Sequence, residues 1–291
     1  MIRIVCGSDG RPSFEASVGG VAIYLDNFAI KTLAKGDPAL RGRFVAALND
    51  GADLLFSVAN AAEISGPQGA SSVAIKEFLD ELGAHWYPVE LVLDTVMKRE
   101  AAGHPPGRCC FSEELLHAYF LTRIGDHSLG SGKIIDLSEG FFRLGAFVDW
   151  LAPQRSWFLD KGREFDTDVK DKIRLLRARL KRDPRFLDSA LPQPQFEPLR
   201  AATFVHGCLM RDLICDSGFQ IRDGDGIDFH HAVIASAFAN FSALDKQWKR
   251  RVENLPKPNL LSRIYYQHEL KAMVADIEAA LGQLRAARAA S

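Results

Sequence analysis

Short apolar runs that end at an acid and lead into a helix constrain the fold of this chain most strongly. Residues 21–25 read VAIYL and end at Asp26, and residues 28–34 then show helical spacing. Residues 241–244 form another strand-like run, which ends at Asp245. In an open parallel sheet, strands alternate with helices and ligands bind outside the carboxyl ends of the strands. We therefore expect an α/β fold, with a mostly parallel central sheet flanked by helices and acids gathered at one edge.

Two further acids occupy comparable places. Residues 54–58 (LLFSV) predict a buried strand, and the helix expected over 59–64 carries Glu63. Asp228 stands directly before a run whose apolar residues recur at helical spacing. The acids that just follow a strand or lie in the first turn of a helix are then Asp26, Glu63, Asp228 and Asp245.

Each acid alone has a structural explanation. Asp26, Asp228 and Asp245 suit helix N-caps, because a carboxylate accepts backbone N–H bonds and is stabilised by the helix dipole, and Glu63 suits an exposed helix face. Four carboxylates crowded without a cation would repel one another, whereas hard divalent ions need oxygen ligands. The four together therefore favour a metal site, with Asp225 as an additional ligand, direct or through water.

Four short motifs, in this order and spacing, resemble the PIN domain. They are YLDN (24–27), SVANAAEI (57–64), DFHHAVIASAFA (228–239) and SALDKQW (242–248). PIN domains form the metal-dependent nuclease fold of many bacterial toxin ribonucleases. The resemblance implies a three-layer α/β fold in which the four acids hold one or two Mg²⁺ or Mn²⁺ ions and RNA, most plausibly single-stranded, is cut internally.

The resemblance has further implications and one departure. It implies a cytoplasmic toxin–antitoxin component that can have an antitoxin-type protein partner. Family members commonly carry a hydroxyl residue two positions before the last acid, where this chain has Ala243. Ser242 is adjacent, but in a strand its side chain should point to the other face.

The resemblance covers the two ends of the chain, so we expect a discontinuous core of residues 1–90 and 218–291. This core should include strands at 85–89 and 262–266 and a C-terminal helix over 269–289. Between the two parts, residues 91–217 contain helical patterns separated by loops rich in Gly and Pro, at 92–101, 113–124, 138–151, 168–180 and 199–215. We expect a helical insertion beside the sheet, without a strand of its own.

Basic residues are the candidate contacts for RNA. The net charge of the chain is −1, so binding to a nucleic acid would need a local patch. A basic ridge of Lys170, Arg174, Arg177 and Lys181 recurs at helical spacing beside an apolar stripe. It is either a solvated helix face or a rail for the RNA backbone. Further candidates for phosphate contacts are His231, which follows Asp228 by three residues, and the cations after Asp245, namely Lys246, Lys249, Arg250 and Arg251.

Two other classes of function stay open. One is a PIN-like protein that binds a nucleic acid or a protein without cutting. The other is an oligomeric scaffold, such as a homo-oligomer, whose interface is made by the insertion and the C-terminal helix. The few cysteines, five in number, suggest reduced thiols in a cytosolic protein. No apolar run approaches the roughly 18 residues of a membrane-spanning helix, and the N-terminus lacks a signal-peptide pattern.

Overall fold

A five-stranded sheet forms the centre of the protein. The computed structural model describes residues 2–6, 12–16, 20–124, 134–136, 143–256 and 258–290. The strand order is β5-β4-β3-β7-β8, and every neighbouring pair in the sheet is parallel. The strands are β3 (Val21–Leu25), β4 (Ala52–Ser57), β5 (Trp86–Val89), β7 (Phe241–Ala243) and β8 (Arg263–Tyr265). The predicted α/β class with a parallel sheet is confirmed.

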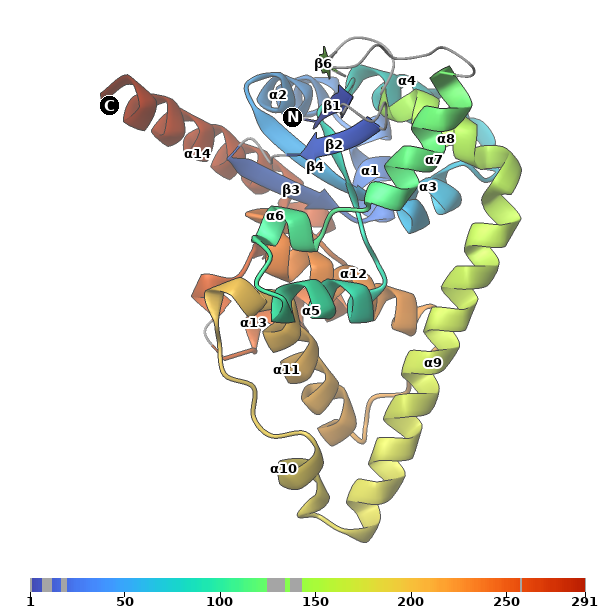
Figure 1. The fold of residues 1–291 in the computed structure, drawn as a ribbon, viewed down its shortest axis with the longest axis vertical. Coiled ribbons are helices and arrows are strands. Elements are labelled where there is room, and N and C mark those ends of the chain that lie inside the picture. The colour runs from blue at the N-terminus through green and yellow to red at the C-terminus, as the bar shows by residue number, and fades with distance from the viewer. Residues whose placement is uncertain are drawn as a thin grey trace.

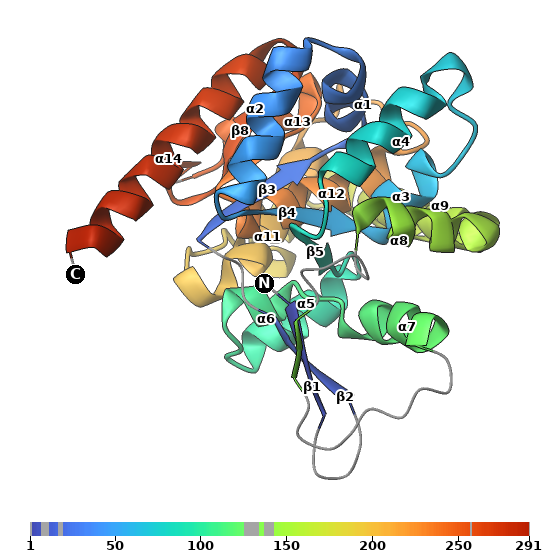
Figure 2. The same ribbon diagram turned by 90° about the horizontal axis from the view of Figure 1, so that it is seen from above.

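Helices cover both faces of the sheet (Figure 2). One layer consists of α1 (Asn27–Lys35), α2 (Pro38–Asn49), α4 (Ser72–Glu81) and α14 (Leu270–Ala290). The other layer contains α5 (Leu93–Ala101), α11 (Ala201–Cys215) and α12 (Asp225–Phe238). In this layer α11 packs against both α5 and α12. Because the sheet is covered on both sides, β3 and β4 are buried along their whole length, which explains their continuous apolar sequences.

The chain changes direction across the sheet beside β3. From β3 it proceeds outward through β4 to β5, and it later returns to place β7 and then β8 on the other side of β3. The gap between the carboxyl ends of β3 and β7 is therefore a topological switch point, where α/β sheets commonly bind ligands. Asp26 and Asp245 follow these two strands directly.

The segment before α11 is dominated by one long helix. Figure 1 shows α9 (Arg155–Arg182) running down one side of the molecule, with α10 (Phe186–Ala190) at its far end and α11 returning towards the sheet. The remaining helices are α3 (Val58–Ile64), α6 (Pro106–Cys109), α7 (Glu113–Ile124), α8 (Leu144–Leu151) and α13 (Lys246–Glu253). The helix expected over 168–180 thus begins much earlier, and residues 138–142 of the helix expected over 138–151 lie outside the described part.

The expectation that residues 91–217 contain no strand is wrong. A second, antiparallel sheet has the order β2-β1-β6, with β1 (Ile2–Cys6), β2 (Pro12–Ala16) and β6 (Ile134–Asp136). The strand β6 is short and pairs with β1, which is far away in sequence, so its partner could not be predicted from local periodicity. Phe111 also forms an isolated antiparallel bridge with Val89 of β5.

The described residues give two further facts about the chain. None of their helices combines the length and apolar character needed to cross a bilayer. Cys109, Cys110 and Cys208 are buried free thiols, and Cys215 is an exposed one.

A candidate acidic site at the carboxyl edge of the sheet

Asp26 and Asp245 lie side by side because their strands are neighbours. The backbone N–H of Asp26 donates to the carbonyl of Ala243 at 3.0 Å, which continues the ladder between β3 and β7. Asp26 is the N-cap of α1 and accepts from the N–H of Asn27 at 2.6 Å. Asp245 is the N-cap of α13 and accepts from the N–H of Trp248 at 2.9 Å. Both predicted caps are confirmed, and both carboxylates stand at the switch point.

Asp228 reaches the same edge from α12, although it does not cap this helix. The helix begins at Asp225, and its N-cap is Gly224 with φ of 96°. The predicted cap at Asp228 is therefore wrong, because the helix starts earlier and its cap, Gly224, lies four residues before Asp228. Asp225 accepts from the N–H of Arg222 at 2.5 Å and lies 3.5 Å from the side-chain amide of Gln247.

Burial and mutual repulsion raise the pKa values of two of these acids. Burial raises the pKa of Asp26 to about 7, and repulsion from Glu63 and Asp245 adds to it against the hydrogen bond from Asn27 and the nearby charge of Lys31. Burial also raises the pKa of Asp228 to about 8, together with repulsion from a group of acids that consists of Asp26, Asp245, Glu63 and Asp225. The structure thus brings all the predicted acids within one another's electrostatic field. We call Asp26, Glu63, Asp228 and Asp245 the acidic site.

The acidic site fits a hard divalent cation in the type of its donors. It offers carboxylate oxygens, and burial together with repulsion between the acids raises the pKa values of two of its members, Asp26 and Asp228. Within the described residues, however, no three carboxylate, imidazole or thiolate groups already form a metal shell. The donor chemistry and the uncompensated charge therefore match such an ion, while the side chains are not gathered into a closed coordination sphere.

A chain of buried polar side chains lies beneath the acidic site. The side-chain amide of Asn27 donates to the carboxylate of Glu63, and its oxygen accepts from Asn60 at 3.3 Å. Asn60 is fully buried and accepts from the hydroxyls of Ser57 at 2.6 Å and Tyr24 at 3.3 Å. Sequence reasoning missed these supports, although Asn60 stands three residues after Ser57, the spacing of a capping box.

His231 terminates this chain and does not face solvent. Its Nδ1 bonds to the hydroxyl of Tyr24, its side chain is 3% exposed, and burial lowers its pKa to about 3. The prediction that His231 contacts phosphate is therefore wrong. Although His231 follows Asp228 by three residues on α12, its side chain is buried against Tyr24. Burial is also the main cause of the raised pKa of Tyr24, which keeps its hydroxyl protonated as a hydrogen-bond donor.

Ser242 does not support Asp245. Its hydroxyl donates to the carbonyl of Ala235 at 3.1 Å and lies 2.7 Å from the hydroxyl of Ser262. Its side chain therefore connects β7 to α12 and to the start of β8, and it points away from Asp245 as the strand alternation predicts. Ala243, which is buried, has no polar group that could support the acid.

Helix α9 braces two of the elements that carry the acids. Asp166 accepts from the N–H groups of Gly224 at 3.0 Å and Gly226 at 2.8 Å, so it caps the start of α12 from outside. A Cβ at Gly226 would meet the backbone of Asp166 at 2.5 Å, which explains a glycine at this crossing. At the other end of α9, Arg155 donates to the carbonyl of Ala62 in α3 at 2.9 Å. The insertion therefore helps to set the positions of Asp228 and Glu63.

Half of the predicted basic ridge points inward. Lys170 is 8% exposed and pairs with Asp166 at 2.8 Å and with Asp223 at 2.6 Å. Arg177 donates to backbone carbonyls at the end of α11 and beyond it, namely those of Leu213, Asp216 and Phe219. The prediction of an outward ridge is therefore wrong for Lys170 and Arg177. Arg174, paired only locally with Asp171, and Lys181 are exposed as predicted.

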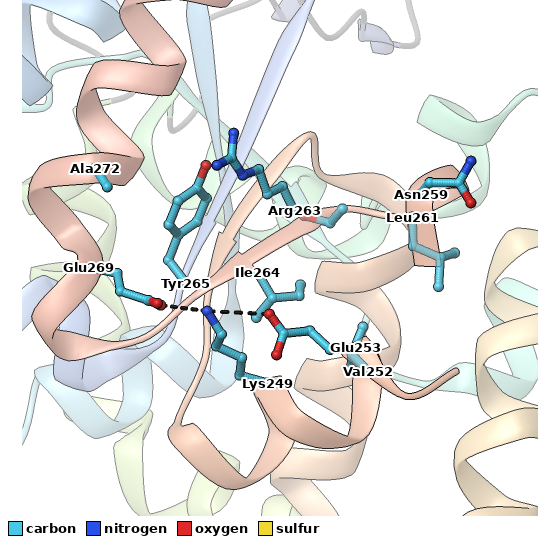
Figure 3. Close-up of a pocket in the computed structure, with 11 residues that line it drawn as sticks. Lys249, Val252, Glu253, Asn259, Leu261, Arg263, Ile264, Tyr265, Glu269 and Ala272 are labelled. Atoms are coloured by element: carbon cyan, nitrogen blue, oxygen red, sulfur yellow. Dashed lines mark hydrogen bonds and ion pairs between the residues drawn. The ribbon is translucent and has the colours of Figure 1, made fainter. Parts of the chain in front are cut away.

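The cations after Asp245 also divide into two groups. Figure 3 shows Lys249 between the carboxylates of Glu253 and Glu269, at 3.3 and 2.6 Å. Arg251 pairs with Asp212 and Asp216 in the direction of α11. Lys246 and Arg250, four residues apart on α13, are exposed. These two remain the candidates for phosphate contacts beside Asp245.

The comparisons with known proteins add no assignment. A scan of protein-family models, a search of curated proteins and a search of solved structures each found no match to this chain.

Proposed function

We propose that this protein is a metal-dependent ribonuclease whose reaction occurs at the acidic site. The observation that carries the proposal is the convergence of acids from four elements at the switch point of a parallel sheet. Burial, together with repulsion from the neighbouring acids, raises the pKa of Asp26 to about 7 and that of Asp228 to about 8. Perturbed carboxylates at such an edge are typical of functional sites, and a bound cation would relieve their repulsion. The resemblance of the motifs to PIN domains supports the same function.

The residues that would hold Mg²⁺ or Mn²⁺ are those of the acidic site, Asp26, Glu63, Asp228 and Asp245. Asp225, whose charge also acts on Asp228, is the additional candidate ligand. When bound, a divalent ion supplies a nucleophile from water and stabilises charge on the phosphate. Other groups of this chain keep the carboxylates in position. Asn27 orients the carboxylate of Glu63, and the helix starts of α1 and α13 fix Asp26 and Asp245.

Single-stranded RNA is the substrate that we propose, because its flexible backbone can bend to bring a phosphate to the acidic site. The exposed cations that would contact its phosphates are Lys246 and Arg250 beside Asp245, with Arg174 and Lys181 further along α9. Because the whole chain carries a net charge of −1, such contacts would supply the attraction locally.

Asp26→Asn tests the proposal, with Asp37→Asn as a matched control. Both aspartates are N-caps and asparagine also caps well, but Asp37 is exposed at the start of α2, outside the acidic site. With Mn²⁺ and end-labelled single-stranded RNA, we expect Asp26→Asn to slow cleavage by on the order of 100-fold or more, as loss of a group that stabilises the transition state does. Asp37→Asn should cleave RNA like the wild type, and EDTA should stop cleavage by both the wild type and Asp37→Asn.

Equal cleavage by the two variants, or cleavage that survives EDTA, would contradict the proposal. RNA that is bound but never cut by the wild type would favour the alternative of a PIN-like binding protein without activity.

A further inference from the structure

A pocket lies beside the acidic site, between α3, α9 and the start of α12. Its volume is about 420 Å³, which is within the usual range of small-ligand sites. Its lining includes Glu63, Phe158, Leu159, Gly162, Arg163 and Ile227. We call it the α3–α9 pocket.

Glu63 connects this pocket to the acidic site. Its side chain lines the pocket, while its carboxylate accepts from Asn27 and its charge contributes to the raised pKa values of Asp26 and Asp228. A group held in the pocket therefore stands next to whatever occupies the acidic site. For a polymer cut at the acidic site, that neighbour is the adjoining unit of the polymer.

The walls of the pocket suit an uncharged flat ring better than a phosphate. Phe158, Leu159 and Ile227 supply apolar surface. Lys170 also lines the pocket, but its charge is balanced by Asp166 and Asp223, which line it too. Arg163 has a side chain that is 77% exposed, and it pairs with Asp160, whose side chain is 63% exposed. Such an exposed pair is weak, so Arg163 can exchange it for a phosphate outside the pocket.

Gly162 lines the pocket at a position where an added side chain would enter open space. It lies within the 28-residue helix α9, where glycine is unfavourable, yet a Cβ at this position would meet no atom within 4 Å. Close packing of helices therefore does not explain this glycine. Its missing side chain leaves space in the pocket, between the rows of residues that line it from α9.

An exposed aromatic side chain stands next to the pocket. Trp157 is 57% exposed, and its ring meets that of Phe158 edge-on with 4.7 Å between centroids. Exposed aromatic rings beside a positively charged side chain are the usual elements that bind single-stranded nucleic acids by base stacking.

We propose that the α3–α9 pocket binds the nucleobase of the nucleotide that adjoins the scissile phosphate. This proposal rests on the ribonuclease function proposed above and adds the subsite that positions the substrate. Phe158 and Leu159 contact the faces of the base, Arg163 contacts the neighbouring phosphate, and Trp157 stacks on the next base along the strand.

The test fills the pocket without disturbing the acids. Gly162→Leu projects a side chain into open space, and Gly282→Leu in α14 is the matched control, because a Cβ at Gly282 also meets nothing within 4 Å. Both changes improve helix propensity, so neither should impair folding. In EDTA, we expect Gly162→Leu to weaken binding of a short single-stranded RNA roughly tenfold, as loss of one stacked base does, and Gly282→Leu to bind like the wild type.

Cleavage by the wild type separates this proposal from the one it rests on. With Mn²⁺, Gly162→Leu should also lose the preference for a base beside the cut. If the wild type cleaves and Gly162→Leu binds and selects bases as Gly282→Leu does, the subsite is refuted and the ribonuclease stands. If the wild type does not cleave, binding of nucleoside 5′-monophosphates decides the matter: binding that Gly162→Leu abolishes supports a base pocket, and no binding refutes it.

Discussion

At the scale of single residues, the acidic site depends on neutral partners as much as on its acids. Asn27 holds Glu63, Asn60 holds Asn27, and the hydroxyl of Tyr24 links Asn60 to His231. Asp26, Asp228 and Asp245 could be predicted from the sequence because each follows a strand or lies in the first turn of a helix, whereas Glu63 lies near the end of α3 and not in its first turn. The supports of these acids could not be predicted, because Tyr24 in a strand and His231 in a helix look like ordinary core and surface residues until the two elements meet.

Tyr24→Phe tests this chain of hydrogen bonds. The change leaves the ring in place but removes the hydroxyl, so Nδ1 of the fully buried His231 loses its partner. We expect a loss of about 1–3 kcal/mol in the free energy of unfolding, which is the cost of an unsatisfied buried polar group. In urea denaturation, His231→Leu should then cost less in the Tyr24→Phe background than in the wild type, because the shared bond is already gone. Strictly additive losses would show that the two side chains do not interact.

At the scale of elements, α9 explains why the helical period was only a partial guide. The period placed Lys170, Arg174, Arg177 and Lys181 on one side of a helix. The pairing of Lys170 with Asp223 and the bonds from Arg177 to carbonyls at the end of α11 depend on how α9 crosses its neighbours, which no local pattern records. The same crossing gives Asp166 its role as an external cap for α12, far away in sequence.

Asp166→Ala tests whether α9 positions the acid-bearing helix. The change leaves the N–H groups of Gly224 and Gly226 without their acceptor and removes one partner of Lys170. We expect unfolding to become easier by about 2–4 kcal/mol, from two lost charge-assisted bonds, and binding of Mn²⁺ to weaken because Asp228 is no longer held. Asp171→Ala, which removes only an exposed pair with Arg174, is the control and should change neither property measurably. Unchanged Mn²⁺ affinity in Asp166→Ala would show that α9 does not position the ligands of the acidic site.

At the scale of the whole molecule, the sheet was accessible to sequence reasoning and the second sheet was not. Strands buried on both faces of a parallel sheet have largely apolar sequences. The runs at residues 21–25 and 54–58 could therefore be predicted as strands from the sequence alone. The pairing of β1 with β6 joins residues 3–5 to 134–136, and the short apolar run at β6 indicates no partner by itself. The proximity of Asp26 and Asp245 was predictable because it needs only the order of the strands, whereas the α3–α9 pocket needs the path of α9.

Two opposing sets of buried groups should keep the stability of the metal-free protein nearly level between about pH 4.5 and 6 and make it fall at higher pH. Burial lowers the pKa of His231 to about 3 and that of His206 to about 4, so the stability that they contribute is lost as pH falls below their unfolded values of about 6.5. Asp26 and Asp228, with pKa values raised to about 7 and about 8, act in the opposite sense. Between pH 6.5 and 8 the folded state binds more protons than the unfolded state, so the free energy of unfolding falls as pH rises.

This fall should amount to about 2 kcal/mol between pH 6.5 and 8 in EDTA, since each pKa unit corresponds to about 1.4 kcal/mol and both acids contribute. A divalent ion replaces the protons, so saturating Mn²⁺ should restore stability most strongly at pH 8, by about 2.7 kcal/mol at a hundredfold excess over its dissociation constant. Denaturant titrations at the two pH values, with Mn²⁺ or EDTA, measure both effects. The Asp26→Asn/Asp228→Asn variant is the control and should show neither the alkaline loss nor the rescue. Stability that stays level or rises from pH 6.5 to 8 in EDTA would mean that these carboxylates do not crowd one another in solution, and the main support for a cation at the acidic site would be lost.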